Sequence, residues 1–280
     1  MRIGWLHIYI GASVALLVII GILSVFGSPP EREPVVLIPY PTFGAMAAAA
    51  FSAETQKRQY IEVVDGCGPY FEDACLNARS GPNVSYPSVG KLRKGVILEV
   101  ESTVEEGGVT WYKIVFHEWL RYPERLNSDW YVAADYVRLF NDDGPQDLRG
   151  KAAPETEKRI VVDRSEQMLY AYDGTELFMQ QPISTGLELT PTPRGTFRVF
   201  RKTPSRYMQG PILGISEKEY DLPGVPWNLY FTEQGAVIHG AYWHTHFGEP
   251  WSNGCVNMPP EKARELYLWA PLGTYVTVRD

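Results

Sequence analysis

The sequence predicts a mostly β protein with two folded regions, one packed helix and one N-terminal membrane-spanning helix. Three observations lead to this prediction. From Tyr60 onward, short runs rich in β-branched and aromatic residues alternate with turn residues, a pattern typical of strands and hairpins. Only the segment after Met258 combines a helix start with an apolar stripe at helical spacing. Residues 5–27 form the longest apolar run of the chain.

The apolar run from Trp5 to Gly27 predicts a membrane anchor over residues 1–28. At about 1.5 Å per residue it is long enough to cross a hydrocarbon core of about 30 Å. Arg2 and the amino terminus precede it, a weak positive-inside signal that places the N-terminus in the cytoplasm and the folded regions outside. A cleaved secretory signal is the alternative, with Val25-Phe26-Gly27 as a site that could be cut, but the apolar core is long for one and no clear Ala-x-Ala site follows it directly. Both interpretations predict export.

Two linkers separate the predicted folded regions. Residues 29–59 begin with clustered prolines and continue with an alanine-rich stretch, which indicates a semi-extended spacer. Residues 60–140 then form a small β domain, with predicted strands at 61–64, 96–100, 111–116, 130–133 and 136–139. Residues 141–158 are polar and contain Gly, Pro and many charges, so they are predicted to be the second linker.

The C-terminal region, residues 159–280, is predicted to be a sheet with one packed helix. Its expected strands lie at 159–163, 168–172, 176–181, 196–201 and 275–279. The helix opens at Met258-Pro259-Pro260-Glu261, because prolines suit a first turn and Glu261 complements its positive end. Its apolar stripe comprises Ala263, Leu266, Tyr267 and Ala270.

Charge and cysteine content narrow the functional classes. A net charge of −7 argues against a general nucleic-acid binder. Cys67 and Cys75 are close enough in sequence to close a small loop in an oxidising compartment. A disulfide is slightly favoured over two free thiols, since spacing alone does not give the geometry. Cys255 is the odd cysteine, and in an exported protein such a thiol is either partner-seeking or reactive.

The segments Ile238-His239-Gly240 and Ser252-Asn253-Gly254-Cys255-Val256-Asn257 carry the strongest chemical signal. A cysteine attacks as a thiolate, and a nearby imidazole is the usual device for forming it. Gly254 would let backbone N–H groups approach a substrate oxygen, as an oxyanion hole requires. Taken singly, Cys255 and His239 are more often core residues. Together with their flanking pattern, they predict an acyl-transfer site.

These segments resemble the catalytic domain of the L,D-transpeptidases (YkuD-like) of bacterial cell-wall synthesis. The family pattern also includes an upstream element, present here as Thr192-Pro193-Arg194-Gly195-Thr196-Phe197 after Ser184-Thr185-Gly186. The resemblance covers roughly residues 159–280. It implies a cysteine-dependent acyltransferase that cross-links peptidoglycan stem peptides, with Cys255 as nucleophile and His239 as base. The same thioester given to water would make an L,D-carboxypeptidase.

Asn253 departs from the family pattern, which has histidine before the Gly-Cys pair. Asparagine forms hydrogen bonds but carries no proton charge, so we interpret it as an orienting residue beside Ser252, Gly254 and Gly240. If that histidine were essential, the chain would instead be a membrane-anchored wall-binding protein with a decayed site. Asn257 either holds the stem peptide through its amide or caps the following helix; the two interpretations are equally favoured.

Further substrate-binding candidates flank the motif. Tyr242, Trp243 and His244 lie between the predicted base and nucleophile and are candidates to contact the substrate, with core packing as the alternative for Tyr242. Five basic residues are candidates to dock peptide carboxylates, although a solvated hairpin face is favoured for all except Arg194: Arg194, Arg198, Arg201, Lys202 and Arg206. The histidines lack further ligands at suitable spacing, so neither a metal nor a cofactor is expected.

Residues 60–140 resemble bacterial SH3-like domains, small β-barrels commonly attached to wall-acting enzymes. The resemblance rests on residues 76–100 and on the pairs Trp111-Tyr112 and Trp130-Tyr131. It implies binding to the cell wall rather than chemistry. The expected partners are therefore donor and acceptor stem peptides, the wall through the SH3-like domain, and the cytoplasmic membrane through a single span, with catalysis on its outer face.

Overall fold

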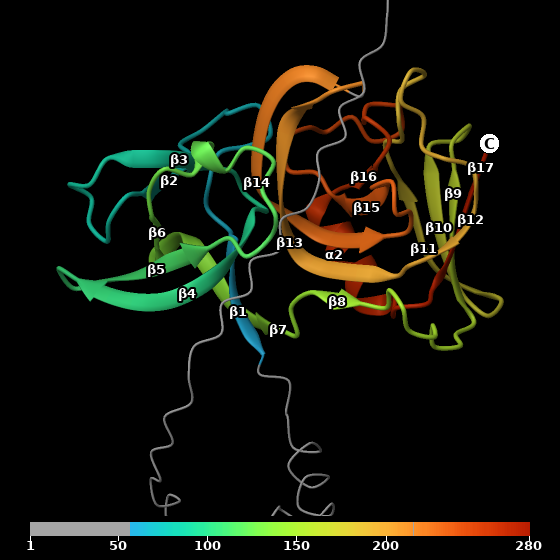
Figure 1. The fold of residues 1–280 in the computed structure, drawn as a ribbon, viewed down its shortest axis with the longest axis horizontal. Coiled ribbons are helices and arrows are strands. Elements are labelled where there is room, and N and C mark those ends of the chain that lie inside the picture. The colour runs from blue at the N-terminus through green and yellow to red at the C-terminus, as the bar shows by residue number, and fades with distance from the viewer. Residues whose placement is uncertain (1–56, 215) are drawn as a thin grey trace, which may run out of the picture. The chain divides into compact units, whose positions relative to one another are not determined.

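The computed structural model describes residues 57–214 and 216–280. The predicted membrane span and most of the first linker lie outside these residues. Within the described part of the chain, no helix is long and apolar enough to cross a membrane. The described residues belong to one compact unit and form three sheets (Figure 1).

The N-terminal sheet has seven strands in the order β3-β2-β6-β5-β4-β1-β7, and neighbouring strands are antiparallel. Its strands are β1 (Arg58–Val63), β2 (Leu76–Arg79), β3 (Ser88–Leu92), β4 (Ile97–Glu106), β5 (Val109–Val115), β6 (Trp130–Ala133) and β7 (Val137–Asp142). Two 3-10 turns interrupt it, η1 (Pro123–Arg125) and η2 (Ala134–Tyr136). Its core is apolar and includes Ile61, Leu92, Leu98 and Val132.

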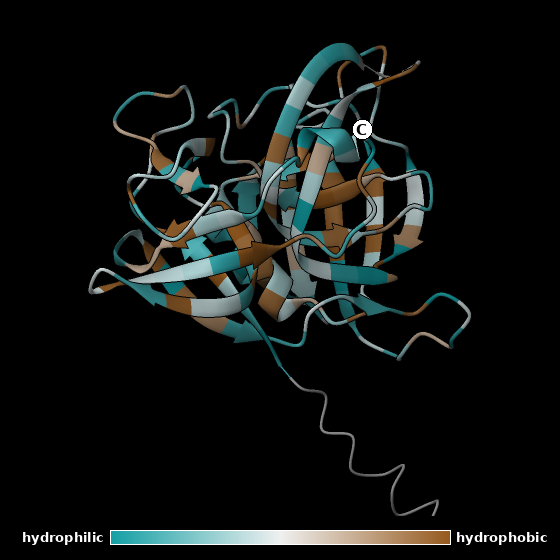
Figure 2. Ribbon diagram, turned by 60° about the vertical axis from the view of Figure 1, so that its left-hand side comes forward, coloured by the Kyte–Doolittle hydropathy of each residue, from teal (hydrophilic) through white to brown (hydrophobic). Residues whose placement is uncertain are grey.

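Two five-stranded sheets make up the C-terminal region, in the orders β11-β10-β9-β17-β12 and β16-β15-β14-β13-β8. The first contains β9 (Lys158–Asp163), β10 (Met168–Asp173), β11 (Glu176–Pro182), β12 (Gly195–Arg198) and β17 (Tyr275–Arg279). The second contains β8 (Gln146–Asp147), β13 (Arg201–Ile212), β14 (Ser216–Tyr230), β15 (Val237–Gly240) and β16 (Val256–Met258). Both sheets and helix α2 (Pro260–Trp269) share one core, and apolar residues concentrate on their strands (Figure 2).

The region between residues 195 and 230 differs most from the sequence prediction. One strand was expected at 196–201, but β12 ends at Arg198 and β13 begins at Arg201 in the other sheet. The transition is fixed at Val199, whose N–H donates to Thr274 O and whose carbonyl accepts from Gly273 N. The predicted second linker, residues 141–158, also contains regular structure, because its strand β8 pairs with β13. The chain thus forms a long β13–β14 hairpin that the sequence did not predict.

Helix α2 lies where the sequence predicted it, and it buries a lysine beneath its C-terminal end. Lys202 Nζ donates to Tyr267 O and Ala270 O, each at 2.7 Å. Burial lowers the Lys202 pKa to about 8. The prediction that Lys202 belongs to a solvated hairpin face is therefore wrong: its ammonium serves the last carbonyls of the helix, where the dipole favours a cation.

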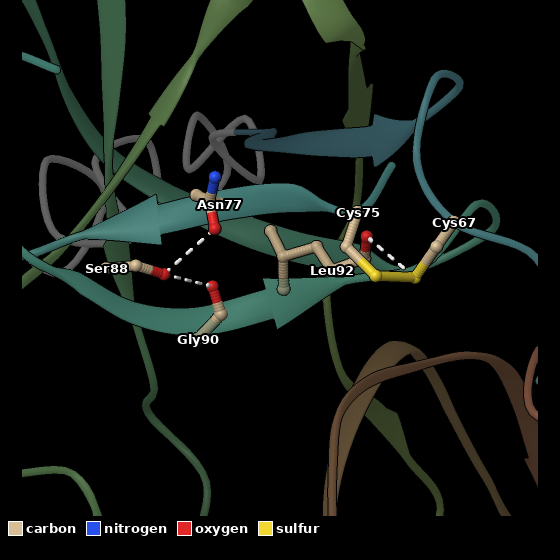
Figure 3. The surroundings of a disulfide bond; sticks show 6 residues. All are labelled: Cys67, Cys75, Asn77, Ser88, Gly90 and Leu92. Atoms are coloured by element: carbon tan, nitrogen blue, oxygen red, sulfur yellow. Dashed lines mark hydrogen bonds between the residues drawn. A yellow bond between two sulfur atoms is a disulfide. The ribbon is translucent and has the colours of Figure 1, made fainter. Parts of the chain in front are cut away.

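Cys67 and Cys75 form a disulfide, as the sequence slightly favoured (Figure 3). The bond closes a loop at the edge of the N-terminal sheet, next to β2 and β3. From this loop Tyr70 reaches the C-terminal region, where its hydroxyl lies 3.3 Å from Thr245 Oγ1. The disulfide loop therefore contacts the segment that precedes Cys255.

A second contact between the two regions involves the residues after β5, which the sequence left unassigned. Tyr122 N–H donates to Gln209 Oε1 at 2.9 Å, and Tyr122 Oη donates to Pro211 O at 2.8 Å. Arg125 Nη1 donates to Gly210 O at 2.9 Å and pairs with Asp221. This insert, residues 117–125, consequently holds the β13–β14 hairpin against the N-terminal sheet.

Candidate active site

Two parallel strands bring the predicted motif residues together. β15 pairs with β16 in a register that places His239 opposite Asn257, and Cys255 immediately precedes β16. A parallel pair needs a crossover connection of a dozen or more residues, which accounts for the length of the segment between His239 and Cys255. We call residues 241–254 the crossover loop.

The segment Ser184-Thr185-Gly186 holds the residues around Cys255 in place. Ser184 and Asn257 exchange two backbone hydrogen bonds, at 3.0 and 2.8 Å. Thr185 O accepts the N–H groups of Trp251 and Ser252, each at 3.0 Å. Two elements that are distant in sequence are thereby joined like paired strands. This explains the place of Ser184-Thr185-Gly186 in the family pattern, for which the sequence offered no role.

The Cys255 thiol is partly buried and neutral. Its Sγ lies 3.8 Å from Gly235 O, an acceptor for the thiol proton. Burial raises the Cys255 pKa, against the opposing effects of the Arg206 guanidinium and of a hydrogen bond from the Val237 backbone. Desolvation disfavours the charged thiolate, so the thiol stays protonated at neutral pH.

The His239 imidazole is fully buried and neutral as well. Its Nδ1 lies 3.0 Å from Gly240 O, and its Nε2 lies 3.1 Å from Asn257 Nδ2. Burial lowers the His239 pKa to about 4, with smaller effects of Arg206 and His244 in the same direction. Since an amide nitrogen only donates, Nε2 is the acceptor and Nδ1 carries the proton that goes to Gly240 O.

A chain of hydrogen bonds extends from His239 through Asn257 to His244. The Asn257 Oδ1 lies 3.2 Å from His244 Nε2, and His244 Nδ1 accepts the N–H of His246 at 3.2 Å. Each contact in this buried chain pairs one donor with one acceptor, which fixes both imidazole tautomers and the orientation of the amide. The helix-cap interpretation of Asn257 is wrong, because Pro259 occupies the N-cap position and the amide serves the two histidines.

Cys255 and His239 lie on neighbouring chain segments without a hydrogen bond between them among the described residues. Sγ faces Gly235 O, and the imidazole Nε2 is taken by Asn257. Catalytic hydrogen bonds are often long in a free enzyme and tighten only with substrate bound. The thiol and the imidazole are thus both neutral, and each faces a partner other than the other.

The glycine and serine residues beside Cys255 mainly shape the backbone. Gly254 adopts φ +109, a conformation that favours glycine, and its N–H donates to Ser252 Oγ at 3.1 Å. Ser252 Oγ in turn donates to Cys255 O at 2.5 Å. The Gly254 N–H is therefore occupied by Ser252 and is not available for the oxyanion contact that the sequence suggested near this glycine. Asn253 is exposed, so it lies on the outer side of this turn.

Gly240 is required by packing. A Cβ at this position would lie 2.8 Å from Pro226 and 3.0 Å from the Pro260 backbone. Its absence lets α2 and β14 approach β15 closely. Gly240 also supplies the carbonyl that accepts from His239 Nδ1, so its backbone orients the imidazole.

The residues predicted to contact the substrate do not lie together in the structure. Trp243 is half-buried with its ring 5.7 Å from that of His239, whereas Tyr242 packs in the apolar core of the N-terminal sheet and donates to Pro223 O at 2.6 Å. The prediction that Tyr242 lines the substrate site gives way to its core alternative. Arg194 is exposed and pairs with Asp280. The partners of His244 are Asn257 and His246.

Sequence reasoning missed Gln167, whose side chain holds the Ser184-Thr185-Gly186 segment through two hydrogen bonds to Thr185. Its Oε1 accepts Thr185 N–H at 2.9 Å, and its Nε2 donates to Thr185 Oγ1 at 2.8 Å. Gln167 has φ +54 and sits between two predicted strands, where it looks like an ordinary turn residue. Nothing in the sequence marked it. Among the described residues, no group of His, Cys, Asp and Glu side chains is arranged to hold a metal ion.

A family model and a curated relative match the C-terminal region of this chain. Residues 157–278 match the family model of the YkuD L,D-transpeptidase catalytic domain. A relative from Bacillus licheniformis, named as the L,D-transpeptidase YkuD, is 29% identical over 123 residues, which are 43% of this chain and 64% of the relative. The match thus spans less than two thirds of that protein.

Solved structures of L,D-transpeptidases are also similar. One from Mycobacterium smegmatis is 21% identical, covers 65% of this chain and 99% of its own, and gives a TM-score of 0.41. A cysteine-to-serine variant from Enterococcus faecium is 27% identical, covers 44% of this chain and 50% of its own, and gives a TM-score of 0.40. By sequence, the part of the chain from residue 157 to residue 278, which holds Cys255, His239 and Asn257, matches the YkuD L,D-transpeptidase catalytic domain.

Proposed function

We propose that this protein is a peptidoglycan L,D-transpeptidase that cross-links stem peptides through a thioester on Cys255. One observation carries the proposal: within the matched domain, Cys255 precedes the strand that pairs with β15, the strand of His239. The buried chain from His239 to His244 further supports it, because a protein that only packs its core has no need to orient two imidazoles so completely.

The reaction begins with a proton transfer inside the site. His239 Nε2 exchanges its contact with Asn257 for the Cys255 thiol and takes the proton. The thiolate then attacks the peptide carbonyl that precedes a terminal D-alanine, and Cys255 N–H stabilises the developing oxyanion. The C–N bond breaks, and imidazolium gives its proton to the leaving amine, which leaves a thioester on Sγ.

The second half of the reaction regenerates the thiol. An acceptor amine attacks the thioester carbonyl and loses its proton to His239. The C–S bond breaks, and the departing thiolate recovers that proton. Because both partners are neutral before and after the cycle, the burial that raises the Cys255 pKa and lowers the His239 pKa costs nothing in the resting state.

His244 acts in this scheme as a positioning residue. Its Nε2–H donates to Asn257 Oδ1, so the amide nitrogen must face His239. A reversed amide would place a carbonyl oxygen beside His239 Nε2 and demand a proton there. His244 thereby keeps His239 in the tautomer that can accept the thiol proton.

The N-terminal part of the chain serves localisation in this proposal. We infer that residues 1–28 anchor the protein in the bacterial cytoplasmic membrane and that the N-terminal sheet is an SH3-like wall-binding domain. The catalytic domain then works on the outer face. A disulfide between Cys67 and Cys75 supports export, since such bonds persist in oxidising compartments.

A wall-binding protein with a decayed site is the second candidate. The observation that favours it is the high Cys255 pKa together with the contact of Sγ to Gly235 O rather than to His239. A carboxypeptidase would share every residue of the proposed mechanism and differ only in admitting water as acceptor.

The test incubates the full chain and its Cys255→Ala variant with purified tetrapeptide muropeptides, followed by mass spectrometry of the products. Cys255-dependent dimers that have lost one alanine are the result expected of a transpeptidase. Tripeptide monomers alone would identify a carboxypeptidase. A folded, wild-type chain that yields neither product would favour the decayed wall-binding protein.

A further inference from the structure

A cavity of about 220 Å³ lies between the N-terminal sheet and the β13–β14 hairpin. Figure 1 shows β13 and β14 in the middle of the molecule, between the N-terminal sheet and the strands β9 to β11. Arg58, Glu99 and residues 116–118 line the cavity from the N-terminal side. Arg201, Thr203, Ser205, Arg206 and Tyr230 line it from the hairpin. We call it the interregion pocket.

The acidic groups of the interregion pocket are already satisfied. Glu99 Oε1 accepts from Arg58 Nη1 at 3.0 Å and lies 3.2 Å from His117 Nδ1, and Glu99 Oε2 accepts from Tyr60 Oη at 3.4 Å. Glu118 Oε1 accepts the N–H of Tyr207 at 2.7 Å, and burial raises the Glu118 pKa. These carboxylates thus have little capacity left to pair with the arginines of the hairpin.

Two arginines of the hairpin, by contrast, form no ion pair among the described residues. The guanidinium carbons of Arg201 and Arg206 lie 5.0 and 5.5 Å from the centre of the same Tyr230 ring. Arg206 Nη1 is buried without a hydrogen-bond partner, and so is Thr203 Oγ1 on the same strand. A buried donor without an acceptor is costly, so these two unpaired donors beside one cavity, together with the Arg201 guanidinium that also lines it, point to a missing oxyanion.

We propose that the interregion pocket binds a carboxylate of the peptide substrate, through Arg206 and Arg201 with Thr203 as an additional donor. The identity of the ligand rests on the proposed function. A guanidinium offers paired N–H donors that match a carboxylate, which makes arginine the usual choice for this task.

The β13–β14 hairpin connects the pocket to the site of His239: β13, which carries Arg206, pairs with β14, and β14 pairs with β15, the strand of His239. The charge of Arg206 acts on both Cys255 and His239, lowering the pKa of each. An extended tetrapeptide spans about 13 Å, and the proposal places its reacting carbonyl at Cys255 and its carboxylate in the pocket. The arginine singled out in the sequence, Arg194, is instead exposed and paired with Asp280.

The experiment measures binding separately from turnover. Titration calorimetry on the full chain carrying Cys255→Ala compares a tetrapeptide acid with the same peptide amidated at its carboxyl groups. Arg206→Gln and Arg201→Gln are each introduced into this background. Arg264→Gln is the matched control, because it removes the same charge from the exposed face of α2, over Trp227.

We expect Arg206→Gln to weaken binding of the acid by about 10- to 100-fold, and Arg201→Gln by a smaller factor in the same range. The amidated peptide should bind weakly to every variant, with no further loss on Arg206→Gln. Equal losses for acid and amide, an equal loss in the Arg264→Gln control, or no binding of the acid to the parent would each overturn the proposal.

Turnover distinguishes a failure of this proposal from a failure of the proposed function. Cys255-dependent dimers formed with an unchanged KM in Arg206→Gln would overturn the pocket alone. Carboxylate-selective binding that depends on Arg206 in a chain without turnover would support the pocket and overturn the transpeptidase.

Discussion

The N-terminal sheet and the C-terminal region are both built mainly of strands, yet they bury different kinds of side chain. In the described part of the chain, every buried polar or charged residue lies between Asp163 and Thr274. The core of the N-terminal sheet is apolar. A buried polar group must find a partner or destabilise the fold, so such groups persist where they are needed for more than packing.

The difference separates a region that contains a buried polar network from a region that supports it. His239, His244 and Asn257 are satisfied by one another, an arrangement that a sheet of alternating apolar residues does not offer. The N-terminal sheet contributes from outside this network. It braces the crossover loop through Tyr70 and holds the β13–β14 hairpin through Tyr122 and Arg125.

The sharpest test of this comparison uses the cysteines of the two regions. Cys255→Ala should lower transpeptidation by about 10⁶-fold, to below detection, since the nucleophile is lost. The thermal unfolding midpoint should change little. The measurements are initial rates on muropeptides and thermal melts followed by circular dichroism. Both are made on Cys255→Ala and on the Cys67→Ser/Cys75→Ser double variant. Equal losses of rate in both proteins would contradict the division of roles.

The buried histidine chain predicts the next largest effect. His244→Ala should lower kcat by about 10²-fold and displace the pH–rate profile, because Asn257 loses the donor that fixes its amide. His244→Gln retains an N–H donor and should recover part of the rate. Unchanged pH profiles in both variants would show that His244 is only a packing residue.

Acid should destabilise the C-terminal region through His239. Its pKa is about 4 when folded and near 6.5 when unfolded, so the unfolded chain binds a proton first as the pH falls. The contribution is complete above pH 6.5 and is lost between pH 6.5 and 4, amounting to about 3 kcal/mol. Urea unfolding across this range should show the loss, and His239→Gln should flatten it. A slope that His239→Gln leaves intact would assign it to other groups.

The smallest expected effect belongs to the N-terminal sheet. Removing the Cys67–Cys75 bond by double serine substitution should lower the free energy of unfolding by about 2.5 kcal/mol, because the unfolded chain regains the freedom of a short loop. The wild-type chain under reducing conditions should match the variant. Activity at saturating substrate should persist, and its complete loss would mean that the Tyr70 contact controls the site.

Several features of the fold could be predicted because they depend on local pattern. Helix α2 follows from its prolines and apolar stripe, and the strands β9, β10, β11 and β17 follow from alternation and turn residues. The β13–β14 hairpin could not be predicted. Its strands are long and interrupted by proline. Their position also depends on three other segments, namely β8, β15 and the insert at residues 117–125.

The sequence by itself determined which residues bring a thiol, an imidazole and an amide to the candidate site. Cys255, His239 and Asn257 stand in a recognisable order because a parallel strand pair needs a connection of that length. Only the tertiary structure decided their protonation and their partners. The burial that sets both pKa values comes from strands and a helix distant in sequence. The same is true of the pocket beside Arg201 and Arg206, which form no ion pair with the residues that the structure describes. Desolvation depends on everything that surrounds a group in space, and the order of residues along the chain does not reveal it.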